Sequence, residues 1–170
     1  MSLDDLAYRE GTDKGTRNRI GLVPKSYTLV YERLLGPIRS EPLTLVEIGV
    51  QKGASLRMWS DWMPNARIVG IDINPAAAIM DTGRGLVRIG DQADKTFLSQ
   101  VISEFGPFDI VVDDGAHTLG ATSRAFEALW PHTTRYYFIE DLQAQPPTRE
   151  WLTSSLLPIS IEGWLAVIRR

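Results

Sequence analysis

The most informative stretch of this chain is Phe108-Asp109-Ile110-Val111-Val112-Asp113-Asp114-Gly115-Ala116-His117. Its short β-branched run, bounded by acids and a glycine, indicates a fully buried strand of a parallel sheet. In open α/β sheets, ligands bind just beyond the carboxyl ends of such strands. The sequence therefore predicts that two carboxylates, a glycine and an imidazole meet where this architecture keeps its chemistry.

A second run follows the same plan, because Tyr136-Tyr137-Phe138-Ile139 ends in Glu140-Asp141. Two neighbouring strands that each deliver paired acids to one edge would form a divalent-metal site. The alternative is that the acids only cap the following helix or end the strand, since aspartate is common at a helix N-cap. In that case one acid of each pair would suffice, and Asp113 could instead point away and bind backbone amides.

The rest of the chain alternates strands with helices, which predicts a doubly wound, Rossmann-like α/β sheet. Residues 1–25 read as a polar surface arm, and Ser26 and Asp94 as the caps of helices over 27–35 and 95–105. Glu162-Gly163 predicts a closing antiparallel hairpin. One domain is expected over 1–170, with an arm and helix in 1–40 and the core in 41–170. The expected strands cover 43–48, 67–72, 86–89, 108–113, 136–139, 157–161 and 164–169.

A nucleoside site is predicted after the first strand, at Glu47-x-Gly49-x-x-x-Gly53. Glycine lets the backbone turn tightly and lets a ligand approach, and the following helix offers free N–H donors. Asp72 ends the next strand, near the ~20-residue spacing at which an acid binds a ribose hydroxyl, and Asp91 ends the third. The spacing differs from G-x-G-x-x-G, which argues against a nicotinamide site, and purely structural turn glycines are the alternative.

Composition excludes several classes of protein. The 170 residues are 44% hydrophobic and 23% charged, with a formal net charge of −3 and no basic block, so we expect no nucleic-acid partner. No apolar run approaches the ~20 residues of a membrane span, and the acidic N-terminus does not resemble a signal peptide. The absence of cysteine excludes disulfides and thiolate chemistry and fits the cytoplasm.

Together, these motifs resemble the class I S-adenosylmethionine-dependent methyltransferases, and more narrowly the macrocin and mycinamicin sugar O-methyltransferases and the rhamnosyl O-methyltransferases. The resemblance runs from about Tyr8 to Leu142. One departure is Pro24-Lys25-Ser26-Tyr27, where that family has a histidine-containing segment. The motifs that carry the resemblance are Gly11-Thr12-Asp13-Lys14-Gly15, Glu47-Ile48-Gly49-Val50, Ser55-Leu56-Arg57-Met58-Trp59, Gly70-Ile71-Asp72-Ile73, Gly90-Asp91-Gln92, Phe108 to His117 and Ile139-Glu140-Asp141-Leu142.

The resemblance implies an Mg²⁺-assisted methyl transfer from S-adenosylmethionine to a hydroxyl of a sugar or glycosylated metabolite. It implies His117 as the general base, a role for which histidine is the most common side chain. Mg²⁺ prefers oxygen ligands, which the edge acids supply. The implied cofactor residues are Glu47, Gly49, Gly53, Asp72 and Asp91, and the implied metal ligands are Asp114, Glu140 and Asp141.

Two other classes of function stay open at this point. One is a nucleotide- or NAD-binding oxidoreductase, against which the metal-type acids count. The other is a non-catalytic partner protein that keeps the methyltransferase fold. The sequence also leaves a homo-oligomer open, and it does not identify the acceptor.

Overall fold

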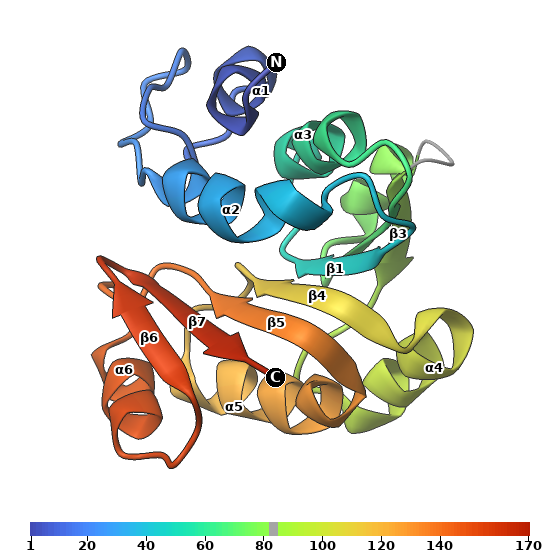
Figure 1. The fold of residues 1–170 in the computed structure, drawn as a ribbon. Helices are drawn as coiled ribbons and strands as arrows, with labels where there is room; N and C mark the ends of the chain where they lie inside the picture. The colour runs from blue at the N-terminus through green and yellow to red at the C-terminus, as the bar shows by residue number, and fades with distance from the viewer. Residues whose placement is uncertain (82–84) are drawn as a thin grey trace.

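The structure is a computed structural model that describes residues 1–81 and 85–170. Within those residues, seven strands form one sheet in the order β3-β2-β1-β4-β5-β7-β6 (Figure 1). The first five are parallel, and β7 pairs antiparallel with β5 and β6. This confirms the predicted doubly wound sheet with its antiparallel C-terminal hairpin. The strands are β1 (Thr44–Ile48), β2 (Arg67–Asp72), β3 (Gly85–Ile89), β4 (Phe108–Asp113), β5 (Thr133–Ile139), β6 (Ile159–Glu162) and β7 (Leu165–Arg169).

Helices cover both faces of the sheet, with α1, α2 and α3 on one side and α4, α5 and α6 on the other (Figure 1). The α-helices are α1 (Leu3–Glu10), α2 (Tyr27–Leu35), α3 (Ala54–Trp62), α4 (Lys95–Phe105), α5 (Leu119–Leu129) and α6 (Pro146–Thr153). Short 3₁₀ turns are η1 (Gly36–Ile38), η2 (Pro75–Met80) and η3 (Trp130–His132). No helix in the described ranges has the length and apolar character needed to cross a bilayer.

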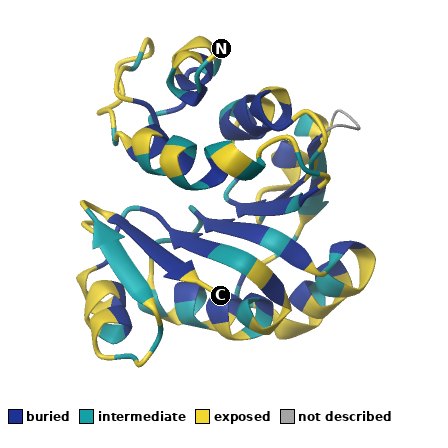
Figure 2. Ribbon diagram, viewed as in Figure 1, coloured by how far each residue is buried: buried dark blue, intermediate teal, exposed yellow. Residues whose placement is uncertain are grey.

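Side chains alternate between two hydrophobic cores, one on each face of the sheet. Figure 2 shows the central strands in the colour of buried residues, with helices whose residues range from buried to exposed above and below them. Leu45 and Phe138 belong to the core under α1–α3, whereas Val46 and Tyr137 belong to the core under α4–α6. Successive residues of a strand point to opposite faces, so a fully buried strand needs apolar residues at consecutive positions. This is why the parallel strands read as continuous apolar runs.

Two local predictions were wrong. Residues 1–25 are not a surface arm throughout, because Ser2 caps α1 by accepting from Asp5 N at 3.1 Å and Leu3 and Leu6 are buried. Ser26 does not cap α2: its φ of +62° is left-handed, and its side chain makes no capping hydrogen bond. Asp94 does cap α4, accepting from Thr96 N at 2.8 Å, as predicted. Helix α6 had no counterpart in the predicted elements.

Candidate active site

A cavity of about 210 Å³ opens at the carboxyl ends of β1 to β4. Its wall depends on two glycines where backbone segments approach closely. A Cβ on Gly49, whose φ is +96°, would lie 2.1 Å from the Asp114 carbonyl oxygen, and a Cβ on Gly115 would lie 2.0 Å from Gln92 Oε1. The close approach of these segments in the cavity wall therefore requires glycine at both positions.

The structure places three of the predicted cofactor residues, Gly49, Asp72 and Asp91, in the lining of this cavity. Asp72 Oδ2 accepts from the backbone N–H groups of Val50 and Gln51, at 2.9 and 2.8 Å. Asp72 thus orders the loop after β1 as well as lining the cavity.

The other two predicted cofactor residues lie behind the cavity wall. Glu47 is fully buried, and its Oε2 accepts from Ser55 Oγ at 2.7 Å. Gly53 precedes α3 with a φ of +68°, so its role in the structure is to begin that helix. Gln92, which the sequence suggested only as part of a motif, does line the cavity.

Gln92 also binds the loop after β4. Its Nε2 donates to Asp113 Oδ1 at 3.2 Å, and its Oε1 accepts from Ala116 N at 2.8 Å. Burial raises the pKa of Asp113 to about 7, against the lowering effect of the hydrogen bonds from Gly115 and Gln92. Asp113 thus points away from its neighbour Asp114 and binds amide groups, which was one of the two sequence-based alternatives.

Lys14 occupies the centre of the acidic edge. Its side chain is 1% exposed, and its ammonium nitrogen lies 2.6 Å from Asp114 Oδ2, 2.8 Å from Glu140 Oε2 and 3.4 Å from Glu47 Oε1. Burial alone would lower the pKa of Lys14, but the three carboxylates outweigh it and hold the pKa well above its usual value. The lysine is therefore charged and links the ends of β1, β4 and β5.

The segment leading into α2 supplies three more groups to the same acids. Tyr31 OH donates to Glu140 Oε1 at 2.5 Å, so both oxygens of Glu140 are engaged on the buried side. Lys25 Nζ bonds both oxygens of Asp141, at 2.9 and 3.0 Å, and Tyr27 OH donates to Oδ1 at 2.7 Å. Partial burial raises the pKa of Asp141, but these bonds lower it by a larger amount, so the pKa lies below its usual value.

Asp114 Oδ1 lies beside an imidazole, together with the Asp141 carboxylate that Lys25 and Tyr27 already engage. Donor atoms of Asp114, His117 and Asp141 all lie within 4.8 Å of one another, and the three side chains are 18–30% exposed. His117 Nε2 is 3.7 Å from Asp114 Oδ1, and a φ of +51° turns the chain there. Among the described residues, no hydrogen-bond partner of the buried His117 Nδ1 is found.

The structure therefore brings together Asp114, Asp141 and His117, with Glu140 on the inner side of the same edge. The sequence analysis missed Lys14, Lys25, Tyr27 and Tyr31 as members of this site. The sequence did contain one signal of a buried cation. Glu47 lies between the apolar residues Val46 and Ile48 of β1, and its side chain is on the same face of the sheet as that of Leu45. An acid on a buried face implies a buried cation to pair with it.

Trp164 stands beside this edge, at the turn between β6 and β7. Its ring is 43% exposed, and the Lys25 ammonium lies 5.9 Å from the ring centroid. Its carbonyl accepts from Leu142 N at 2.9 Å, which fixes the turn next to Asp141. An exposed aromatic face thus adjoins the acid cluster.

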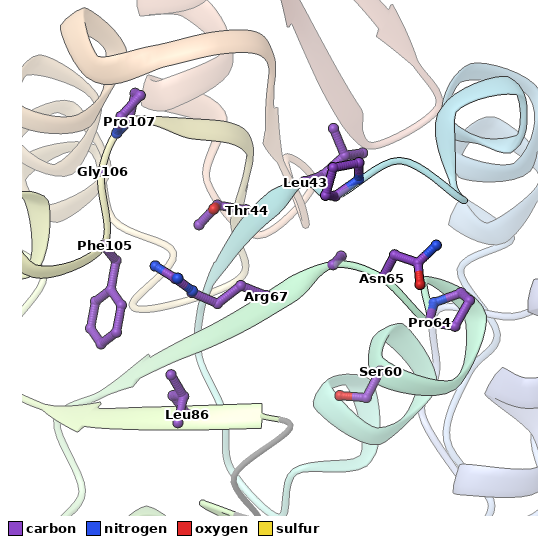
Figure 3. A pocket seen from close by; sticks show the side chains of 12 residues that line it. Leu43, Thr44, Ser60, Pro64, Asn65, Arg67, Leu86, Phe105, Gly106 and Pro107 are labelled. Carbon is purple, nitrogen blue, oxygen red and sulfur yellow. The ribbon is translucent and has the colours of Figure 1, made fainter.

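A larger cavity, of about 570 Å³, lies at the opposite edge of the sheet (Figure 3). Thr44, Arg67, Leu86 and Phe105 point into it from β1, β2, β3 and the end of α4 (Figure 3). None of the predicted site residues lines it. Size alone therefore does not identify the site, because the acids, the imidazole and the helix N-termini all gather at the other edge.

Comparison with known proteins gives relatives that are sugar O-methyltransferases. The 8-demethyl-8-(2-methoxy-alpha-L-rhamnosyl)-tetracenomycin-C 3'-O-methyltransferase of Streptomyces olivaceus is 38% identical over 125 residues, which are 68% of this chain and 32% of that protein. The mycinamicin VI 2''-O-methyltransferase of Micromonospora griseorubida is 35% identical over 68% of this chain and 31% of that protein. The chain spans about a third of the length of these curated relatives.

Solved structures show the same fold. MycE methyltransferase from the mycinamycin pathway, in complex with Mg, SAH and mycinamycin VI, superposes with a TM-score of 0.87 and 27% identity, over 100% of this chain and 53% of that one. A putative caffeoyl-CoA O-methyltransferase from Staphylococcus aureus, at 13% identity and a TM-score of 0.68, shares the fold over 88% of this chain and 85% of that one. A family model described as a methyltransferase domain matches residues 46–136. With its class I Rossmann-like sheet and this match over more than half its length, the chain belongs to the methyltransferase domain family.

Proposed function

We propose that this chain carries the catalytic centre of an S-adenosylmethionine-dependent O-methyltransferase that acts on a sugar hydroxyl of a glycosylated natural product. One observation carries the proposal: Asp114 both lines the cavity after β1–β4 and belongs to the cluster with His117 and Asp141. A cofactor in the cavity and an acceptor at the cluster would therefore meet at one residue. The names of the relatives, which act on rhamnosyl and macrolide glycosides, support this acceptor class.

The cavity fits an adenosyl group. Asp72 and Asp91 offer carboxylates at the ends of β2 and β3, and Gly49 and Gly115 line the same cavity. A carboxylate after the second strand suits ribose hydroxyls. We therefore assign Asp72 to the ribose and the Asp91 region to the adenine, while Glu47 and Gly53 support the loop from behind.

The cluster fits a hard divalent cation. Asp114 offers a carboxylate oxygen there, and Asp141 offers oxygens that also accept from Lys25 and Tyr27; both lie within 4.8 Å of a His117 nitrogen. Carboxylates and retained waters are the ligands that Mg²⁺ favours. We assign Asp114 and Asp141 as the residues that would hold the ion, with Glu140 engaged from the inner side by Lys14 and Tyr31.

In this proposal, bound S-adenosylmethionine supplies a methyl group on a sulfonium centre, and bound Mg²⁺ supplies positive charge that favours ionisation of the acceptor hydroxyl. His117 takes the proton from that hydroxyl as the new carbon–oxygen bond forms. The buried packing around Glu47, Lys14 and Glu140 holds the three strand ends together, so that donor and acceptor are oriented for an in-line displacement.

Transfer of labelled methyl from S-adenosylmethionine to a panel of rhamnosyl and macrolide glycosides tests the proposal. We expect label in a glycoside with Mg²⁺ and none in excess EDTA. Asp141→Asn should lose transfer, whereas Glu150→Gln, at an exposed acid on α6, should keep it. Full transfer in EDTA would mean that the acids are structural, and label on a non-sugar acceptor alone would move the proposal to another substrate class.

A further inference from the structure

We propose that the Lys14 ammonium is a built-in cation that fills the inner half of the acidic edge, and that its charge confines a divalent ion to the outer half, at Asp114 and Asp141 beside His117. The inference rests on the proposed function for the outer ion, and it gives Lys14 a role beyond that of holding the strand ends together. It makes Lys14 a positioning residue, one that decides where a metal sits without touching the acceptor.

The geometry around Lys14 is that of a cation in a carboxylate cage. Oxygens of three different strand ends approach the ammonium, at 2.6 Å from Asp114, 2.8 Å from Glu140 and 3.4 Å from Glu47. The lysine is 1% exposed, and Glu47 and Glu140 are 0% and 2% exposed. Three carboxyl groups surround one lysine. Burial raises the pKa values of Glu47 and Glu140, whereas the ammonium that they face favours their charged forms, and at the pH of 8 used below the group would attract another small cation if the ammonium were absent.

Asp114 connects the inner and outer halves of the edge. Its Oδ2 bonds Lys14 at 2.6 Å, while its Oδ1 faces His117 Nε2 at 3.7 Å. One carboxylate can therefore serve an inner ammonium and an outer ion at the same time. Repulsion between the two positive charges keeps the divalent ion on the outer side, where an acceptor can reach it.

The charge of Lys14 is not needed to hold its own segment in place. Backbone bonds already do so: Lys25 N donates to Asp13 O at 2.8 Å, Ser26 N to Gly15 O at 2.9 Å and Thr28 N to Lys14 O at 3.0 Å. A methionine at position 14 would keep those bonds and most of the side-chain volume. What it would remove is the positive charge.

Titration of Mn²⁺, a probe of hard divalent sites, into the wild type and into Lys14→Met at pH 8, followed by electron paramagnetic resonance, tests the inference. We expect Lys14→Met to bind a second Mn²⁺, or one Mn²⁺ about tenfold or more tightly, because a repelling charge is lost and a carboxylate cage is vacated. A purely structural role for Lys14 would not make metal binding tighter. Unchanged or weaker Mn²⁺ binding in folded Lys14→Met would overturn the inference.

Two further variants separate charge from packing. Tyr31→Phe removes the other hydrogen bond to Glu140 but keeps Lys14, so it should bind Mn²⁺ as the wild type does. Lys14→Arg keeps the charge and should restore the wild-type stoichiometry. An equal gain of Mn²⁺ binding in Tyr31→Phe would mean that a loosened Glu140 is the cause, and Lys14 would lose the proposed role.

Thermal melting with and without Mn²⁺ tests the inference even if Lys14→Met is only marginally stable. An ion that binds only the folded state raises its stability. Mn²⁺ should therefore raise the melting temperature of Lys14→Met by more than it raises that of the wild type. Failure of Lys14→Met to fold even with Mn²⁺ would overturn the inference. If the wild type binds no Mn²⁺ while Lys14→Met binds one, the outer metal site is wrong and the role of the Lys14 charge is retained. If the wild type binds Mn²⁺ and Lys14→Met binds none, the role of Lys14 is wrong and the outer metal site is retained.

Discussion

His117 differs from His132, the other histidine, in its place in the fold and in its neighbours. His117 is partly exposed beside Asp114, whereas His132 is exposed in the η3 turn after α5. A base must lie within reach of the proton it abstracts. Only the first of these histidines adjoins the acid cluster.

We predict that His117→Ala slows methyl transfer by about 10²–10⁴-fold, the usual contribution of a positioned base. Binding of S-adenosylhomocysteine should persist, because the cavity does not include His117. Single-turnover transfer of labelled methyl measures the effect, with His132→Ala as the matched control that keeps the wild-type rate. Equal rates in the two variants would remove His117 from the chemistry.

Asp72 carries the second prediction at this scale. Its carboxylate accepts from two backbone N–H groups of the loop after β1, and we assign it to the ribose. Asp72→Ala should weaken S-adenosylhomocysteine binding by roughly 1.5–3 kcal/mol, the range for hydrogen bonds that involve charge. Calorimetric titration measures this, and an affinity equal to that of the wild type would place the ribose elsewhere.

At the level of elements, α1 is tied to the segment that carries Lys14 through Asp4. Asp4 accepts from Thr16 N at 2.6 Å, Thr16 Oγ1 at 2.7 Å and Thr28 Oγ1 at 2.9 Å. Partial burial raises the pKa of Asp4, but these bonds and Arg17 bring it below its usual value. A carboxyl with a lowered folded-state pKa stabilises the fold above its unfolded pKa and loses that contribution as the pH falls through the folded value.

Asp4→Ala should therefore lower the free energy of unfolding by about 1–3 kcal/mol at pH 7, the cost of leaving such donors unpaired. The difference from the wild type should begin to shrink as the pH falls below about 4, where the unfolded-state carboxyl takes up a proton, and should be lost below the lower pKa of the folded state. Urea unfolding at pH 7 and pH 3 measures it. Asp5→Ala, at an exposed position of the same helix, should have a smaller effect; a loss that does not change with pH would contradict the role of the Asp4 charge.

The β6–β7 hairpin carries the prediction about the acceptor. Trp164 presents an exposed ring beside Asp141, and apolar faces of sugars stack on such rings. Trp164→Ala should raise the KM for a glycoside about 3–10-fold with little change in kcat, the pattern expected when uniform binding is lost. Trp164→Phe should keep most of the affinity. A fall in kcat without a change in KM would point to a structural role for the ring.

Most elements could be predicted from the sequence because their signals are local. The buried strands are continuous apolar runs, Asp94 caps α4, and Gly163, with a φ of +64°, forms the turn of the hairpin. Ser26 failed because its backbone adopts a left-handed conformation, in which a side-chain cap does not form. Helix α1 was missed because its composition is polar, although Leu3, Leu6 and Ala7 have the spacing of a buried helical face.

For the whole molecule, topology made the location of the site predictable. Parallel strands end at one edge, so the acids at the carboxyl ends of β1 to β5 had to gather there. The sequence could not place Lys14, because its bonds to Asp114 and Glu140 span 100 and 126 residues. Such ion pairs depend on how the N-terminal segment folds back over the edge, and no local pattern encodes that path. The roles of Glu47 and Gly53 behind the cavity, rather than in its lining, depend on the same tertiary packing.

Binding of the methyl donor is the central claim, and calorimetric titration of the wild-type protein with S-adenosylhomocysteine and, separately, with NADH tests it most directly. The cavity lined by Gly49, Asp72 and Asp91 predicts saturable binding of S-adenosylhomocysteine at one site per chain and no binding of NADH. A heat of binding with NADH but not with S-adenosylhomocysteine would favour a nicotinamide-binding oxidoreductase. The absence of a heat of binding with either ligand would favour a non-catalytic protein with this fold. Either result would contradict the methyltransferase proposal.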